Sequence, residues 1–168
     1  YSWARFQTDP GDMNTGRMIY RDPEFRLGVN GVALYNNAGN GLVSVTRVTR
    51  PSDCPTTSPY CMLVTATGAA SPGFGGFCQP IYSRSNAIFI QRFVAKLPVG
   101  YRFATASNSM GTGYKDQFLT SAEGTGKYEV YVRRVDCGTM GTFSSGGHVY
   151  IGGSPTPTAA SPLYCYIA

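Results

Sequence analysis

Turn-forming residues recur through this sequence about every ten residues, and this spacing limits the folds that the chain can adopt. The chain holds 21 glycines and 11 prolines in 168 residues. Between them lie short segments rich in Val, Ile, Thr, Tyr and Phe, and none has apolar residues at helical spacing over a useful length. The pattern therefore predicts strands joined by loops. We expect strands at 25–34, 42–49, 60–67, 87–97, 101–106, 127–136, 148–152 and 163–168.

The sequence shows no internal repeat and no change of composition that would mark a domain boundary. We expect one domain over residues 1–168, in which residues 1–22 form an irregular lead-in because TDPGDMNTG is rich in turn formers. A chain of this size buries about two thirds of its unfolded surface, which is enough for one core. Many short strands must close into a sandwich or a barrel to protect their edges.

Side chains alternate along four of the expected strands, and alternation shows which residues share a face. In 163–168, for example, Leu163, Cys165 and Ile167 alternate with Tyr164 and Tyr166. We assign the aliphatic sets to the core, including the set with Val130 and Val132. The remaining side chains form an expected outward set, which is aromatic and charged: Arg92, Lys96, Glu129, Tyr131, Arg133, His148, Tyr150, Tyr164 and Tyr166.

This outward set has the chemistry of a sugar-binding surface. A tyrosine ring can stack on a sugar while its hydroxyl stays hydrogen-bonded, and arginine or glutamate can reach sugar hydroxyls or acidic substituents. Two other interpretations remain open: the face packs against a sister subunit, or it is ordinary strand surface, where tyrosine is common. The candidate carbohydrate-binding residues are Arg92, Glu129, Tyr131, Arg133, His148, Tyr150 and Tyr164.

The charge balance points to an anionic partner. Charged residues make up 14% of the chain, against about 25% in average proteins. The net charge is +5, and 11 of the 14 basic residues are arginine, which grips carboxylates and phosphates with paired hydrogen bonds. An acidic polysaccharide fits this balance. We do not expect nucleic acid, because the arginines are scattered and no nucleic-acid motif occurs. We also expect no membrane insertion, because no apolar stretch is long enough to span a bilayer.

The five cysteines are an odd number, so they cannot all pair within the chain. They contain no CxxC spacing, and the sequence has a single histidine, so we expect no structural zinc site. Cys54 and Cys61 could bridge across the loop PTTSPY. For Cys165 and Cys78 the favoured interpretation is a small buried hydrophobic side chain.

We find no catalytic constellation in the sequence and expect a protein that is not an enzyme. No GxSxG elbow occurs, and the glycine segments at 111–113 and 124–127 lack the phosphate-loop spacing. A glycosidase needs only two carboxyls, so the nine acidic residues leave that alternative open. We expect no cofactor beyond a structural calcium ion, with Asp22 and Glu24 as candidate ligands; an ordinary acidic turn is the alternative.

Several segments carry a resemblance to known families. The opening RDPEFRLGVNGVALYNN resembles that of galactose-binding-like β-sandwiches, although Arg26 stands where that family has an acidic residue. YCMLVTATG and AIFIQRFVAKLPVGY are similar to central strands of carbohydrate-binding modules of that type. In their order along the chain, DPGDMNTGRM, SPGFGGF, FVAKLPVGY, ASNSMGTG, LTSAEGTGKYEVYV and CGTMGTFSSGGHVYIGG resemble the C-terminal domain of tailed-bacteriophage tail fibres or tailspikes.

This resemblance implies a jelly-roll β-sandwich that binds polysaccharide on the bacterial host surface without catalysis. It also implies a homotrimer attached to upstream fibre or spike domains and located on the virion tail. Free thiols would indicate folding in a reducing compartment, here the host cytoplasm. Two alternatives remain open: a structural domain that trimerises or caps the fibre, and a polysaccharide-degrading enzyme.

Overall fold

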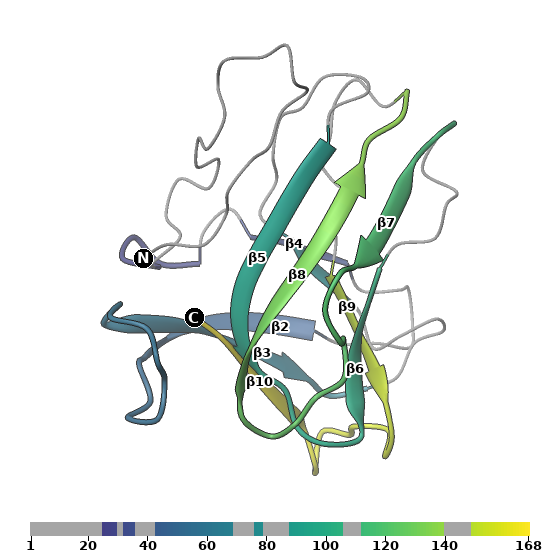
Figure 1. Cartoon of the computed structure of the whole chain (residues 1–168). Coiled ribbons are helices and arrows are strands. Elements are labelled where there is room, and N and C mark those ends of the chain that lie inside the picture. The colour runs from purple at the N-terminus through teal and green to yellow at the C-terminus, as the bar shows by residue number, and fades with distance from the viewer. Residues whose placement is uncertain are drawn as a thin grey trace.

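The computed structural model describes residues 25–29, 32–35, 43–68, 76–78, 88–105, 112–139 and 149–168. Its regular elements are ten strands in two antiparallel sheets (Figure 1), which confirms the all-β class and is consistent with a β-sandwich. Within these ranges no helix is long and apolar enough to cross a membrane.

The two sheets differ in size. The smaller has four strands in the order β1 (Ala33–Tyr35), β4 (Gly76–Cys78), β9 (Val149–Gly153), β6 (Tyr101–Thr105). The larger has six strands in the order β2 (Val43–Thr49), β3 (Tyr60–Ala66), β10 (Leu163–Ile167), β5 (Ile88–Lys96), β8 (Tyr128–Asp136), β7 (Lys115–Phe118).

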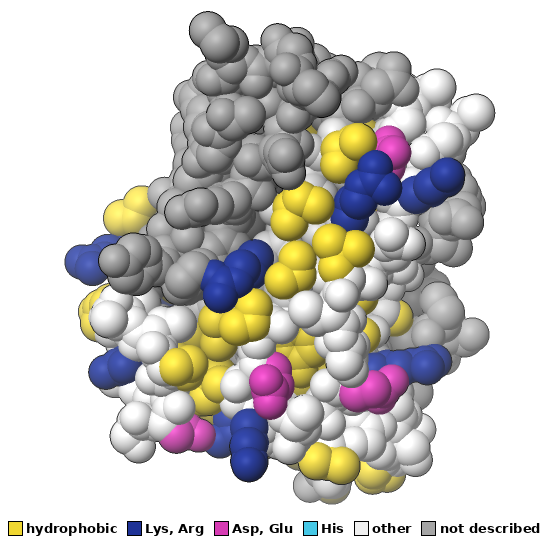
Figure 2. Space-filling view, viewed as in Figure 1, with side chains coloured by type: hydrophobic (Ala, Val, Ile, Leu, Met, Phe, Trp, Pro, Cys, Tyr) yellow, Lys and Arg dark blue, Asp and Glu magenta, His cyan; other side chains and the backbone are white. Residues whose placement is uncertain are grey.

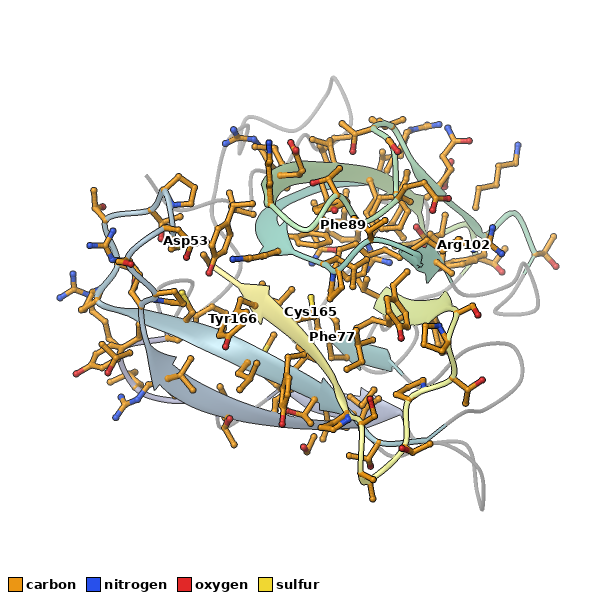
Figure 3. All side chains as sticks on the ribbon, turned by 90° about the horizontal axis from the view of Figure 1, so that it is seen from below. Asp53, Phe77, Phe89, Arg102, Cys165 and Tyr166 are labelled. Carbon is orange, nitrogen blue, oxygen red and sulfur yellow. The ribbon has the colours of Figure 1, made fainter. Side chains whose placement is uncertain are left out.

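Buried side chains of both sheets meet in one core. Phe103 on β6 packs edge-on against Phe93 on β5 and Tyr131 on β8, with ring centroids 5.4 and 4.7 Å apart. Aromatic pairs in this arrangement are favourable beyond the apolar area that they bury. Cys165 of β10 and Phe77 of β4 also belong to this core and lie between the sheets (Figure 3).

The alternation expected from the sequence is confirmed in β9 and β10 and in part in β5. Leu163, Cys165 and Ile167 of β10 are buried, as are Val149 and Ile151 of β9. In β5 the expected core side chains Phe89, Phe93 and Ala95 are buried, followed by Leu97 just beyond the strand. Gln91 of the same face is only half-buried, however, and Val94 of the opposite face is buried as well.

The face assignment of β8 was wrong. Tyr131 and Arg133, which we expected to point outward, are 1% and 2% exposed, whereas Val130 is 39% exposed. Tyr131 is inside because it pairs in register with Phe93, whose ring belongs to the core. Alternation had identified the two faces correctly, but it cannot say which face meets the other sheet.

The strand bounds needed three corrections. Of the expected strand 25–34, residues 25–28 form a turn, closed by a 3.2 Å hydrogen bond from the Gly28 amide to the Phe25 carbonyl. β4 and β7 occur in segments that we expected to be loops. Both are short, three and four residues, and lie within stretches rich in turn formers, which hides the period of two.

Candidate functional site

Three side chains form a row across the outer face of the larger sheet, the face turned away from the core. Lys96 of β5 pairs in register with Tyr166 of β10 on one side and with Tyr128 of β8 on the other. The Lys96 ammonium lies 5.7 Å from the centroid of the Tyr128 ring, within the range of a cation–π contact. The row places one cation between two tyrosines.

A surface hollow of about 320 Å³ opens beside this row. We call it the Tyr128 hollow, and its lining residues are Asp53, Pro55, Gly126, Lys127 and Tyr128. The Asp53 carboxylate accepts a 2.6 Å hydrogen bond from Lys96 Nζ, and this bond is the main reason why the pKa of Asp53 is lowered. Asp53 lies on the loop that borders the row, on the same side of the molecule as Tyr166 (Figure 3).

One wall of the Tyr128 hollow is the loop between β2 and β3. The Cys54 amide donates to the Pro51 carbonyl over 3.1 Å, which closes a tight turn around Asp53. The Arg50 guanidinium donates to the carbonyls of Cys54 and Thr56 and so crosses the loop from its base. These bonds fix the direction in which Asp53 and Pro55 project.

The other wall is the turn that leads into β8. The Gly124 amide donates to the Tyr101 carbonyl over 2.7 Å, and the Gly126 amide donates to the Leu97 carbonyl over 2.9 Å. Gly126 has a φ of +75°, a backbone conformation that other residues rarely adopt. The first wall is held by hydrogen bonds within its own loop and by the Lys96–Asp53 pair, and the second by hydrogen bonds to Leu97 and Tyr101, so the hollow is largely preformed.

Tyr128 forms the aromatic side of the hollow. Its hydroxyl is buried and has no hydrogen-bond partner in the part of the chain that the structure describes. Burial, with smaller contributions from Cys54, Cys61 and Asp53, raises the pKa of Tyr128, so the phenol stays neutral at physiological pH. The side chain therefore acts as a neutral aromatic surface.

The lining suits a polyhydroxylated ligand that carries negative charge. The aromatic ring can stack on a sugar, and the Asp53 carboxylate can accept hydrogen bonds from hydroxyls. Lys127 and Lys96 contribute two positive charges against the single negative charge of Asp53, so an acidic group is favoured over a basic one.

The described lining offers little to a metal ion or to hydrolytic chemistry. Asp53 is the only carboxylate among the described lining residues, whereas glycoside hydrolysis uses two. Over the described ranges, no group of three His, Cys, Asp or Glu side chains gathers where it could hold a metal ion.

The structure does not gather the candidate residues of the sequence into one surface. Arg92 and Tyr164 lie on the outer face of the larger sheet, whereas the half-buried Tyr150 belongs to β9 of the smaller one. Glu129 is exposed at the start of β8, where it accepts a 3.2 Å hydrogen bond from Thr125 Oγ1. His148 and the candidate calcium ligands Asp22 and Glu24 lie outside the described residues.

Tyr131 and Arg133 cannot be surface contacts, because both are inside the protein. The Tyr131 hydroxyl donates to the Glu123 carbonyl over 3.2 Å. Arg133 donates from Nε to Gln91 Oε1 over 2.5 Å and from Nη1 to Asp116 Oδ2 over 3.0 Å. A buried guanidinium with a carboxylate and an amide as acceptors is satisfied, and this explains why an arginine can occupy the core side of β8.

Sequence reasoning missed most of the hollow. Lys96 and Tyr166 were placed outward, but Tyr128 was grouped with Val130 and Val132 in the core set. The hollow depends on the pairing of Lys96 with Tyr128 and on a loop some 70 residues away, and no local pattern encodes either. The one local feature that could have pointed to it is the sequence Lys127-Tyr128 directly after a glycine turn.

Together these features define an all-β protein of two antiparallel sheets with a shallow, aromatic and charged hollow beside the larger sheet. No known family model matches this chain, and no curated protein is significantly similar to it.

Proposed function

We propose that this protein is a non-catalytic carbohydrate-binding domain that holds polysaccharide of a bacterial surface in the Tyr128 hollow. The observation that carries the proposal is the hollow itself, whose lining holds an aromatic ring, one ammonium group and one carboxylate between two hydrogen-bonded walls. The ammonium group of Lys96 lies beside the hollow, where it pairs with the Asp53 carboxylate. Preformed sites of this kind lose little entropy when they bind a ligand.

The ligand class follows from the charges. Two lysines and one aspartate leave the site with one net positive charge, and the whole chain carries +5. A glycan with uronic acid, phosphate or another acidic substituent would meet attraction both near the site and at long range. A shallow site gives weak binding by itself, and three copies in one particle would raise the overall avidity by about 10² or more.

The biological setting is part of the same proposal. The order of the segments that resemble tail fibres and tailspikes supports a receptor-binding domain on a bacteriophage tail, within a homotrimer. The low share of charged residues, 14%, also suits an exposed glycan-binding surface. We further propose that the strands follow a jelly-roll topology, which the strand order in a crystal structure of the chain would test.

A glycan array with matched variants tests the site. We expect the purified chain to bind acidic bacterial polysaccharides, and Tyr128→Ala to weaken this binding about tenfold because the stacking surface is lost. Tyr128→Phe keeps the ring and should bind like the wild type. Tyr164→Ala removes an exposed tyrosine of the same face away from the hollow and serves as the control.

The outcomes separate the three functions. Equal weakening by Tyr164→Ala and Tyr128→Ala would move the site elsewhere on the sheet. If the folded chain binds neither the array nor host cells, the structural role is the better account. Release of reducing ends from the polysaccharide, abolished in Glu129→Gln, would instead show an enzyme.

One observation favours the structural role as a second candidate. Apolar side chains gather on the outer face of β5 and β8 between basic ones (Figure 2), among them the exposed Val130 and the half-buried Ile90 and Val132. Apolar residues in such a position can bury themselves against another subunit. Light scattering of the wild type and of Val130→Lys tests this: a trimer that dissociates in the variant would place the face at a subunit contact.

A further inference from the structure

Two free thiols face each other beneath the loop that forms one wall of the Tyr128 hollow. Cys54 lies in this loop and Cys61 is the second residue of β3, and their sulfur atoms are 3.8 Å apart. Both side chains are buried, with exposed fractions of 4% and 0%. We propose that Cys54 and Cys61 are an oxidisable pair, which closes into a disulfide when the folded protein meets an oxidising solution.

The fold holds the pair ready for this bond. Cys61 is fixed, because β3 is paired with β2 on one side and with β10 on the other. Cys54 is brought to it by the turn that its amide closes with Pro51 and by the Arg50 guanidinium on its carbonyl. The sulfurs need to approach from 3.8 Å to the ordinary bond length of about 2.05 Å. A loop residue can supply a movement of this size without disturbing the sheet.

The two thiols have different roles in the exchange. Burial, followed by the neighbouring Cys54, raises the pKa of Cys61 to about 12, so Cys61 stays protonated at neutral pH. Cys54 is the slightly more exposed of the two, and Thr56 Oγ1 lies 3.3 Å from its sulfur, where the hydroxyl can donate to a thiolate. Cys54 is therefore the group that meets the oxidant first.

The reaction balances with a small-molecule disulfide such as oxidised glutathione. The Cys54 thiolate attacks one sulfur of the oxidant, forms a mixed disulfide and releases one small thiol. Cys61 then loses its proton and attacks the Cys54 sulfur, which releases the second small thiol and leaves the Cys54–Cys61 bond. Two electrons and two protons pass from the protein to the oxidant. The raised pKa of Cys61 makes the second step slow at pH 7 and faster at alkaline pH.

The bond would tie the Asp53–Pro55 wall of the hollow covalently to β3. A cross-link over so short a loop removes conformations from the unfolded chain rather than adding contacts to the folded one. Its effect therefore appears first in thermal stability.

The test uses the full chain, incubated at pH 8.5 with oxidised glutathione or with a reductant. Chymotryptic cleavage after Tyr60 separates the two cysteines, so a linked Cys54–Cys61 peptide pair should appear only in the oxidised, non-reduced digest. The melting temperature of the oxidised sample should exceed that of the reduced sample by roughly 5–10 °C. Cys54→Ser, which alters the loop and leaves the sheet intact, should lose both the linked peptides and the temperature difference.

Three outcomes would overturn the proposal. The first is that both thiols remain alkylatable after prolonged oxidation of folded protein. The second is a linkage of Cys54 or Cys61 to another cysteine in place of the expected pair. The third is a temperature difference that persists in Cys54→Ser, because the stabilisation would then arise elsewhere.

Discussion

Two ion pairs of the larger sheet have similar distances between nitrogen and oxygen but differ in how far their side chains are exposed to solvent. Lys96 and Asp53 meet at 2.6 Å on the surface, with side chains 34% and 53% exposed. Arg133 and Asp116 meet at 3.0 Å in the interior, with side chains 3% and 0% exposed. The shorter contact is therefore the one that water can replace.

The difference separates a pair that serves the fold from a pair that is available for binding. An exposed pair contributes little to stability, because water and salt screen it and both side chains lose freedom. A buried pair is costly to break, because removal of one partner leaves the other charge without solvent. In this protein the buried pair fixes β7 against β8, whereas the surface pair presents its charges at the rim of the Tyr128 hollow.

The largest expected loss of free energy of unfolding comes from breaking the buried Arg133–Asp116 pair. Arg133→Met keeps most of the side-chain volume but leaves the Asp116 carboxylate buried and uncompensated, and should lower the free energy of unfolding by about 3–5 kcal/mol. Urea denaturation measures this loss. The double variant Arg133→Met with Asp116→Leu should recover much of it, since no buried charge remains. A double variant as unstable as the single one would contradict the electrostatic explanation.

The second largest expected effect is the pH dependence of the stability that Arg133→Met loses. Burial raises the pKa of Asp116, while Arg133 and Tyr114 partly offset this, so loss of Arg133 raises the pKa further. A carboxyl with a raised pKa in the folded state favours folding when it is protonated and opposes folding when it is ionised. The defect should therefore be largest at pH 7 and shrink by about 1 kcal/mol or more at pH 4.5. Urea midpoints of wild type and variant at both pH values check this; a constant difference would count against it.

Two tyrosine hydroxyls of β8 extend the comparison to neutral groups. Tyr131→Phe removes the hydrogen bond to the Glu123 carbonyl and should cost about 1 kcal/mol. Tyr128→Phe removes a buried hydroxyl that has no partner among the described residues, so it should leave stability unchanged or slightly raised. Thermal melting of the two variants in parallel gives the contrast. Equal losses would mean that the Tyr128 hydroxyl is hydrogen-bonded after all.

The smallest effect on stability is expected at the surface pair. Lys96→Met should leave the urea midpoint unchanged within error, because water replaces the ammonium at Asp53. The same variant should weaken binding of acidic glycans at low salt and have less effect at high salt. A clear loss of stability would place the Lys96–Asp53 pair with the buried one and remove the distinction between them.

The sequence predicted the strands of five residues or more from segments rich in Val, Ile, Thr, Tyr and Phe between turn-forming residues, and alternation assigned the faces in four of them. β2, β3, β5, β6, β8, β9 and β10 lie within a residue or two of the expected ranges, and in β10 the buried residues also agree with the prediction. β4 and β7 were not predicted, because three or four residues show too little periodicity to be recognised among glycines.

The site was less predictable than the strands, and Arg133 shows why. An arginine in a strand is normally placed outward, and it is inside here only because Asp116 and Gln91 approach from other strands. The Tyr128 hollow likewise depends on how Lys96 and Asp53 meet. Such partners are brought together by register and topology, which residue types along one strand do not specify.

The position of β10 has a consequence for how the chain acquires its structure. The strand formed by Leu163–Ile167 lies in the middle of the larger sheet, between β3 and β5. During synthesis β2–β3 and β5–β8–β7 can form as separate antiparallel units, but they cannot join until residues 163–167 have left the ribosome. Contacts between residues far apart in the sequence form slowly, and both units expose an unpaired strand edge until β10 pairs with them. β10 therefore joins the two units of the larger sheet, and a variant from which residues 163–167 are deleted should leave β3 and β5 with unpaired edges.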